Sequence, residues 1–235
     1  MSVEMRQHTY TSELESVLRA HANRELAESM EAYMRHLFPF LGIRTPERNA
    51  LVKQFMKEHG VPAGEELEAV VRELWSKPER EFHYAAMMLL EKRKKDADAG
   101  QVGLLEELIT THSWWDTVDL LASHQVGNVF TRYPELVSVY TEKWIASEDM
   151  WLRRTAILYQ LGYKGRTDAE LLFSLIRRTA HETEFFIRKA IGWALREYAK
   201  TDAAAVQRFV AETELSPLSV REALKHVGAG DEPAE

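Results

Sequence analysis

The residues best suited to chemistry lie in the segment Ser113-Trp114-Trp115-Asp116-Thr117-Val118-Asp119. If this segment is helical, Trp115 and Asp119 lie four residues apart and share one face, whereas Trp114 points about 100° away from Trp115. An indole beside a carboxylate suits a reaction in which positive charge develops, because both groups attract cations. The alternative is that both tryptophans lie in the core and Asp119 is a solvated helix residue.

A second unusual segment is Ile191-Gly192-Trp193-Ala194-Leu195-Arg196. A glycine in the middle of a helix costs about 1 kcal/mol relative to alanine. Gly192 is therefore easier to understand if a neighbouring helix or a ligand approaches the backbone closely. The alternative is that Trp193 is a packed tryptophan beside a packing glycine.

Cations recur at a fixed spacing in the second half of the chain. The pair Arg153-Arg154 is followed 35 residues later by Arg188-Lys189. A single charged pair on a helix is typical of a solvated face. Recurrence at equivalent positions favours instead a track of contacts to phosphates.

Several other chemistries have no support in the sequence. The chain has no cysteine, which excludes disulfides, thiolate nucleophiles and cysteine metal sites. Its nine histidines are scattered without metal-ligand spacing, and no serine-hydrolase elbow or phosphate-binding glycine loop begins a helix. We therefore expect no metal and no cofactor.

The elements that position these residues are predicted to be helices throughout. Strand-like alternation is almost absent, and helix signals divide the chain into about twelve helices. Thr45 is a predicted N-cap before Pro46, and Gly60 a predicted helix end. Ser147 and Thr183 begin two further segments. Three pairs have the spacing of a capping box: Ser12 with Glu15, Ser113 with Asp116 and Ser219 with Glu222.

A weak internal repeat of about 35 residues indicates stacked helical hairpins. A hairpin of this length cannot bury its apolar face alone, so we expect a HEAT-like solenoid forming one domain over residues 1–227. Residues 228–235 are predicted to be a disordered tail. Equivalent positions in the repeat predict one row facing a groove: Asn49, Tyr84, Asp119, Arg154 and Lys189.

Composition is that of an ordinary globular protein of 235 residues. The net charge of −7 argues against a nucleic-acid partner when taken alone, but it is unevenly distributed. Residues 141–200 carry 11 Lys and Arg against 8 Asp and Glu, so a local basic surface is compatible with the total. We expect a cytoplasmic protein, because the chain has no apolar signal core and no membrane-spanning run.

Collinear blocks make the chain resemble the AlkD family of bacterial DNA alkylation-repair glycosylases over residues 24–227. The most specific blocks are Ser113-Trp114-Trp115-Asp116 and Lys189-Ala190-Ile191-Gly192-Trp193-Ala194-Leu195-Arg196-Glu197-Tyr198-Ala199-Lys200. The resemblance implies an all-α HEAT-like superhelix whose concave face binds duplex DNA. It also implies a monomer that excises 7-methylguanine, 3-methyladenine and, in some relatives, bulkier cationic adducts, without pulling the base fully into a pocket.

Carried over to this sequence, the resemblance assigns the catalytic carboxylate to Asp119 and the two flanking indoles to Trp115 and Trp193. It places Tyr33 near the same site and assigns Arg154 a contact to the DNA backbone near the lesion. The predicted DNA-binding residues further include Thr45, Arg48, Lys53, Arg188, Lys189 and Arg196. Asn49 departs from some relatives, which have an arginine there; we expect this to weaken one phosphate contact and to leave the catalytic set intact.

Two alternatives from other functional classes stay open at this stage. The first is a helical-repeat scaffold that binds another protein and has no catalysis, which the net charge of −7 fits. The second is a family member that binds DNA but has lost its activity. Release of free 7-methylguanine from methylated duplex DNA separates the predicted glycosylase from both.

Overall fold

A computed structural model describes residues 3–227, with side chains from residue 7 onward, and no strand occurs in that range. The predicted all-α class is therefore confirmed. The described residues belong to two compact units, Met1–Asp98 and Ala99–Glu235, each with its own core. That the whole of residues 1–227 is one domain stays a prediction, and the predicted tail at 228–235 lies outside the described residues.

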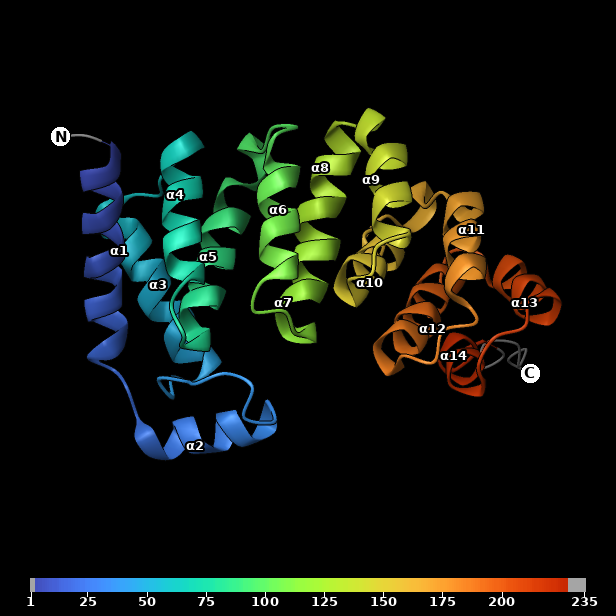
Figure 1. Ribbon diagram of the computed structural model, residues 1–235, viewed down its shortest axis with the longest axis horizontal. Coiled ribbons are helices and arrows are strands. Elements are labelled where there is room, and N and C mark those ends of the chain that lie inside the picture. Colours follow the sequence, from blue (N-terminus) through green and yellow to red (C-terminus); the bar gives the residue numbers. More distant parts are fainter. Residues whose placement is uncertain (1–2, 228–235) are drawn as a thin grey trace, which may run out of the picture. The chain divides into compact units, whose positions relative to one another are not determined.

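The N-terminal unit contains five α-helices and a short 3₁₀ turn, drawn from blue to green in Figure 1. They are α1 (Val3–Arg19), α2 (Arg24–Tyr33), α3 (Thr45–His59), α4 (Gly64–Trp75), α5 (Arg80–Arg93) and η1 (Lys94–Asp96). Helices α1 and α4 pack together, as do α3 and α5, and the apolar faces of α4 and α5 meet in the core of the unit.

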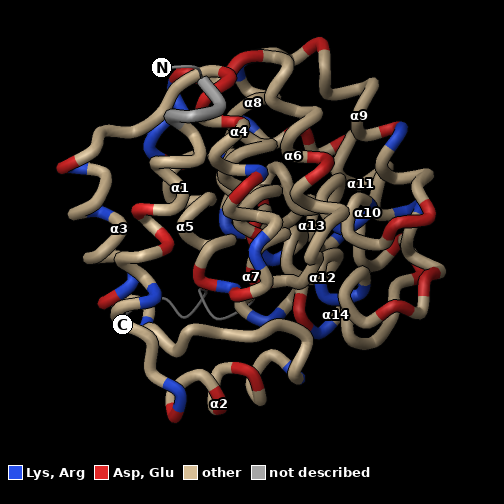
Figure 2. Tube along the Cα trace, turned by 60° about the vertical axis from the view of Figure 1, so that its left-hand side comes forward, with Lys and Arg blue, Asp and Glu red and all other residues tan. Residues whose placement is uncertain are grey.

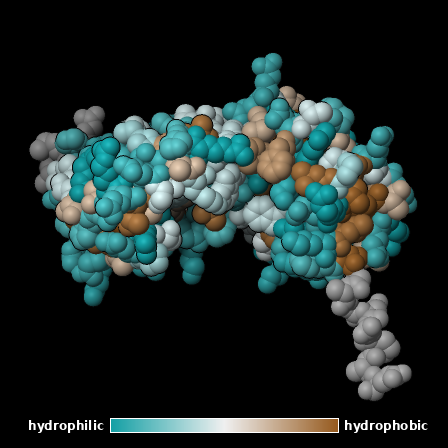
Figure 3. Space-filling view, turned by 90° about the horizontal axis from the view of Figure 1, so that it is seen from below, coloured by the Kyte–Doolittle hydropathy of each residue, from teal (hydrophilic) through white to brown (hydrophobic). Residues whose placement is uncertain are grey.

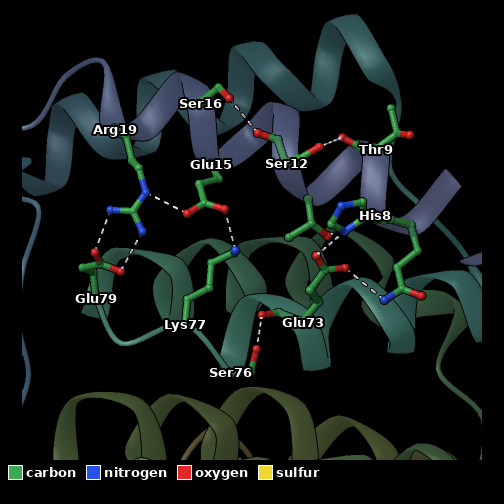
Figure 4. Close-up of polar contacts among 12 residues, drawn as sticks. His8, Thr9, Ser12, Glu15, Ser16, Arg19, Glu73, Ser76, Lys77 and Glu79 are labelled. Atoms are coloured by element: carbon green, nitrogen blue, oxygen red, sulfur yellow. Dashed lines mark hydrogen bonds and ion pairs between the residues drawn. The ribbon is translucent and has the colours of Figure 1, made fainter. Parts of the chain in front are cut away.

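Ion pairs connect α1 to the residues that follow α4, as Figure 4 shows. The Glu15 carboxylate lies 2.7 Å from Arg19 Nε and 2.5 Å from Lys77 Nζ. Arg19 in turn donates two hydrogen bonds to Glu79, at 2.7 and 3.2 Å. Burial is the largest single effect and raises the pKa of Glu15, but the hydrogen bonds and charges of Lys77 and Arg19 together outweigh it, so that the pKa is lowered. Both cations therefore face an ionised carboxylate at neutral pH.

The C-terminal unit contains the remaining helices and all of the segments singled out for chemistry. They are α6 (Gln101–Thr110), α7 (Trp115–Leu120), η2 (Leu121–Val126), α8 (Gly127–Arg132), α9 (Glu135–Ile145), α10 (Met150–Leu158), η3 (Lys164–Arg166), α11 (Ala169–Thr179), α12 (Phe185–Ala199), α13 (Ala203–Glu212) and α14 (Pro217–Ala223). The π-helical turn η2 joins α7 to α8 without a break, so the described range holds 14 α-helices in 13 continuous rods, close to the predicted number.

Alternate helices of this unit form a row in which each contacts the next. Helix α10 packs on α7 and α12, and α12 packs on α14, while α9 and α11 contact each other as a second layer. Figure 1 shows the same order from green through orange to red. This is the stacking of a helical-repeat solenoid, as predicted, and it carries equivalent repeat positions from one helix to the next. A concave DNA-binding face stays a prediction.

Two glycines in this unit allow close helix contacts. A Cβ on Gly192 of α12 would lie 2.5 Å from Glu222 Cβ and 3.0 Å from the Ser219 carbonyl oxygen, both on α14. A Cβ on Gly127 would lie 2.6 Å from the Tyr159 carbonyl oxygen at the end of α10. The sequence left open whether a helix or a ligand approaches Gly192, and the structure places helix α14 there.

The predicted helix starts were less accurate than the helices themselves. Helix α3 begins at Thr45 with Arg44 as its N-cap, so Thr45 lies one position later than predicted, while Gly60 does follow the helix end. The other predicted starts do not cap their helices in the structure: Ser12, Ser113, Ser147, Thr183 and Ser219. Ser113 shows why, because its hydroxyl donates to the Ile109 carbonyl oxygen of the preceding helix. Serine and threonine bond local carbonyls as readily as helix N-termini, so spacing alone does not fix a cap.

Charges of both signs are interspersed over the two units, as the tube in Figure 2 shows. On the face seen in Figure 3, the larger hydrophobic area lies on the C-terminal unit. Exposed large apolar residues of that unit include Leu120, Val139 and Phe185. None of the described helices is long and apolar enough to cross a membrane.

Candidate active site

Asp119 lies in the last turn of α7, one turn after Trp115. The preceding residue Val118 faces the core, whereas Asp119 keeps 9% of its surface exposed and lines a cavity. Directly after this turn the helix widens into the π-turn η2, and the Ser123 hydroxyl donates to the Asp119 carbonyl oxygen at 2.7 Å. Such π-turns occur frequently at functional sites, because they change the direction in which a neighbouring side chain points.

Arg154 of α10 holds the Asp119 carboxylate from one side. Its Nε donates to Asp119 Oδ1 at 2.7 Å and its Nη2 donates to Oδ2 at 2.9 Å. The third nitrogen, Nη1, donates to the Phe186 carbonyl oxygen at the start of α12. With Arg154 only 4% exposed, this two-point contact fixes the plane of the carboxylate. The contact of Arg154 to the DNA backbone stays a prediction, and in the structure its side chain holds the carboxylate of Asp119.

Two opposing effects act on the charge of Asp119. Burial raises its pKa above the ordinary aspartate value, while the hydrogen bonds and positive charge of Arg154 lower it. The net shift is upward, with a small further contribution from the nearby charge of Asp116. Two N–H groups facing two carboxylate oxygens require both oxygens to accept, which is the geometry of the ionised form.

The cavity beside this pair lies wholly within the C-terminal unit and has a volume of about 350 Å³. Its lining comes from α7, α10, α12 and α14: Trp115, Asp119, Arg154, Phe185, Phe186, Lys189, Trp193, Arg196 and Glu222. Trp115 and Asp119 therefore share a face, as their spacing predicted, and Trp193 joins them from a helix more than 70 residues later. The aromatic walls of the cavity suit a cationic group, and its lining also carries two carboxylates and three cations. A second, smaller cavity of about 140 Å³ between α10, α11 and α12 contains none of the predicted site residues.

Trp114 has a different environment from its neighbour Trp115, as predicted. Its ring packs edge-on against Trp151 at 5.7 Å and Phe186 at 5.0 Å, and those two rings lie 5.0 Å apart. Phe186 also lies under the Arg154 guanidinium at 5.7 Å. The aromatic cluster thus extends to Arg154. No sequence motif marked Phe185 or Phe186 as a site residue, although Phe186 occupies the repeat position of Trp151.

Lys189 and Arg196 line the cavity from α12, two helical turns apart on one face. Both pair with a single carboxylate: Lys189 Nζ lies 3.0 Å from Glu222 Oε1, and Arg196 Nη1 lies 2.6 Å from Glu222 Oε2. Arg188 does not line the cavity, and its Nε donates to the Glu182 carbonyl oxygen. Arg153, the other member of the predicted phosphate track, pairs with the Glu182 carboxylate.

Glu222 was predicted to be the capping partner of Ser219, and that prediction is wrong. The N-cap of α14 is Ser216, whose hydroxyl accepts from the Ser219 backbone N–H at 3.1 Å. Glu222 points instead toward α12. The charge on Glu222 was visible in the sequence, but its partners lie 26 and 33 residues away, and no local pattern connects them.

The other predicted DNA-binding residues belong to the N-terminal unit: Tyr33, Thr45, Arg48 and Lys53. Tyr33 ends α2 and is 73% exposed, and Thr45 and Lys53 are exposed on α3. Arg48 is buried, with its guanidinium 4.3 Å from the centre of the Tyr84 ring and a hydrogen bond to Asn49 Oδ1 at 3.1 Å. Two pairs from the predicted repeat row are therefore connected. Asn49 and Tyr84 both contact Arg48, and Asp119 is bonded directly to Arg154. The DNA contacts of all four residues stay predictions.

Comparison with known proteins adds two similarities. A family model described as "DNA alkylation repair enzyme" matches residues 14–227. A solved structure described as a predicted DNA alkylation repair enzyme from Enterococcus faecalis is 35% identical, with a TM-score of 0.82. That similarity covers 88% of this chain and 97% of the other, so it includes described helices of both units. A search of curated proteins gave no match.

Proposed function

Because the chain belongs to the DNA alkylation repair enzyme family, we propose that it is a monofunctional DNA glycosylase. The proposed substrates are cationic alkylated purines in duplex DNA, namely 7-methylguanine, 3-methyladenine and bulkier adducts of the same charge. The enzyme acts without taking the base fully out of the helix. The observation that carries the proposal is a carboxylate, Asp119, held by Arg154 on a cavity that two indoles also line.

The chemistry of the substrate explains why a single carboxylate is enough to catalyse cleavage of the glycosidic bond. Alkylation at N7 or N3 places a positive charge on the purine, so the base leaves as a neutral molecule and needs no proton from a general acid. As the bond between C1′ and the purine nitrogen breaks, its electron pair goes to the base and positive charge appears on the sugar. A fixed carboxylate nearby stabilises that oxocarbenium ion, as in glycosidases. Water then bonds to C1′ and loses a proton to solvent.

Trp115 and Trp193 add a second source of stabilisation for positive charge. The negative face of an indole attracts a cation by about 1–2 kcal/mol when the site is partly desolvated. Because both indoles line the cavity, they act on the cationic base and on the sugar as its charge rises. Neutral damaged bases do not gain this stabilisation, which supports selectivity for lesions that are already charged.

The contacts of Arg154 support a further role for it beside the predicted contact to DNA. Since two of its nitrogens hold Asp119 and the third holds the backbone of α12, its function is to fix the carboxylate toward the cavity. This pre-orientation lowers the reorganisation needed when the sugar becomes charged. Lys189 and Arg196, at the edge of the same cavity, are then the cations proposed to contact phosphates near the lesion.

The test is release of free 7-methylguanine from methylated duplex DNA by the full chain. We expect Asp119→Asn to slow release by about 10²-fold or more, because the fixed charge is lost while the shape is kept. Asp116→Asn is the matched control, since it removes a carboxylate from the same helix without changing the contact to Arg154. Equal rates for Asp119→Asn and the wild type would overturn the role of Asp119. No release by the wild type would favour a DNA-binding or scaffold protein, and salt-dependent binding to unmodified duplex would separate those two.

A further inference from the structure

The cavity is lined by more positive than negative side chains, which disfavours binding of a cationic substrate. Three are positive and two are negative, and they come from all four helices of the row: Asp119, Arg154, Lys189, Arg196 and Glu222. Asp119 is paired with Arg154. The other two lining cations, Lys189 and Arg196, therefore share a single carboxylate, that of Glu222. Lysine and arginine at this position attract phosphates, but they also repel a positively charged base or sugar.

Glu222 is placed between these two cations by the packing of α14 on α12. One carboxylate oxygen lies 3.0 Å from Lys189 Nζ and the other 2.6 Å from Arg196 Nη1. The close approach at Gly192, where a Cβ would lie 2.5 Å from Glu222 Cβ, brings the side chain of Glu222 onto α12 between the two cations. Hydrogen bonding to Lys189 and then to Arg196 outweighs a smaller burial effect and lowers the pKa of Glu222, so the group is ionised at neutral pH.

These contacts contribute little to folding. The Lys189, Arg196 and Glu222 side chains are 37%, 23% and 18% exposed, so solvent screens both ion pairs. A glutamate that lines the cavity also lowers its affinity for phosphate. Its placement on the two lining cations that Asp119 does not hold therefore indicates a role in the charge of the cavity.

We propose that Glu222 sets the charge balance of the active-site cavity, reducing its positive potential so that a cationic base is accepted and the sugar can become charged. This inference rests on the proposed glycosylase function and extends it to a residue that does not touch the substrate. Lys189 and Arg196 keep further N–H donors for phosphates, because an ammonium has three such donors and a guanidinium five. Glu222 thus lowers affinity for DNA in general and raises the rate at which the charged lesion is excised.

Glu222→Gln tests this inference, because it removes the charge and keeps the shape that packs against Gly192. The charge balance predicts effects of opposite sign on two measurements. Binding of a labelled unmodified duplex, followed by fluorescence anisotropy, is expected to tighten by about 3- to 10-fold at about 50 mM salt, and less at about 200 mM. Single-turnover release of 7-methylguanine at saturating enzyme is expected to slow by about 3- to 10-fold, because the extra positive charge opposes the charge on the sugar.

Two further variants keep the interpretation specific. Glu197→Gln removes a carboxylate of α12 that pairs with Lys200 at 2.6 Å and does not line the active-site cavity, and it is expected to change neither measurement. Glu222→Asp retains the charge and is expected to restore the excision rate toward that of the wild type. Retained helical circular dichroism in each variant shows that the chain folds.

The outcomes separate the possible roles. A Glu222→Gln variant that binds DNA more weakly and excises more slowly would overturn the inference and make Glu222 a structural support. Unchanged binding or unchanged excision would overturn it as well. Failure of the proposed function is recognised separately, since it appears as absence of base release by the wild type before any variant is compared, and the inference is then rejected with it.

Discussion

Breaking the Asp119–Arg154 pair gives the sharpest test of how this site is built. The pair joins α7 to α10 through hydrogen bonds of 2.7 and 2.9 Å, and its side chains are 12% and 5% exposed. Removing one partner of a buried ion pair leaves an uncompensated charge and typically costs about 3–5 kcal/mol. We therefore expect Arg154→Gln to destabilise the C-terminal unit by about 3 kcal/mol, at the lower end of that range because Asp119 still reaches the cavity.

The assay is urea unfolding followed by tryptophan fluorescence. Five of the six tryptophans lie in the C-terminal unit, and only Trp75 lies in the other, so the signal reports mainly on the unit that contains the pair. A double-mutant cycle with Asp119→Asn isolates the interaction. Because the asparagine side chain of that variant carries no charge, adding Arg154→Gln to it should cost about 2 kcal/mol less than adding Arg154→Gln to the wild type.

The same variant distinguishes two roles for Arg154. If it fixes the carboxylate, Arg154→Gln slows excision at saturating enzyme and leaves binding to unmodified duplex nearly unchanged. If it mainly contacts a DNA phosphate, the variant weakens binding, lowers the salt dependence and leaves the midpoint in urea unchanged. Wild-type stability together with lost DNA affinity would refute the interpretation drawn from the geometry.

Two more predictions follow from the same contacts. Gly192→Ala would place a Cβ 2.5 Å from Glu222 Cβ, so α14 must shift; we expect a loss of about 1–3 kcal/mol in urea unfolding, and an unchanged midpoint would mean that α14 moves without cost. Because burial raises the pKa of Asp119 and only its ionised form stabilises the sugar, excision should fall as the pH drops through a value above that of an ordinary aspartate. This acid limb should be absent from the residual activity of Asp119→Asn, and a limb at the same pH in that variant would assign the titration to another group.

The sequence by itself determined the helical class of the protein and the pairing of Trp115 with Asp119 on one helix face. Apolar periodicity sets which segments are helical, since each helix needs one buried face; the all-helical class is confirmed, although most of the predicted helix starts are wrong. Trp115 and Asp119 share a face because four residues complete about one helical turn, which requires no tertiary information. The spacing of about 35 residues likewise placed Asp119 and Arg154 at equivalent positions, where the stacked helices α7 and α10 bring them into contact.

Only the tertiary structure decided which partner each charged side chain takes. A local sequence pattern cannot say whether Arg154 faces a phosphate or Asp119, because that choice depends on how α7, α10 and α12 stack. The same is true of Glu222, whose spacing from Ser219 imitates a cap, and of Phe186, whose contacts reach Trp114 and Arg154. Caps and helices follow from interactions within a few residues, whereas the charge and shape of the cavity arise from contacts between residues far apart in the chain, which exist only once the hairpins have stacked.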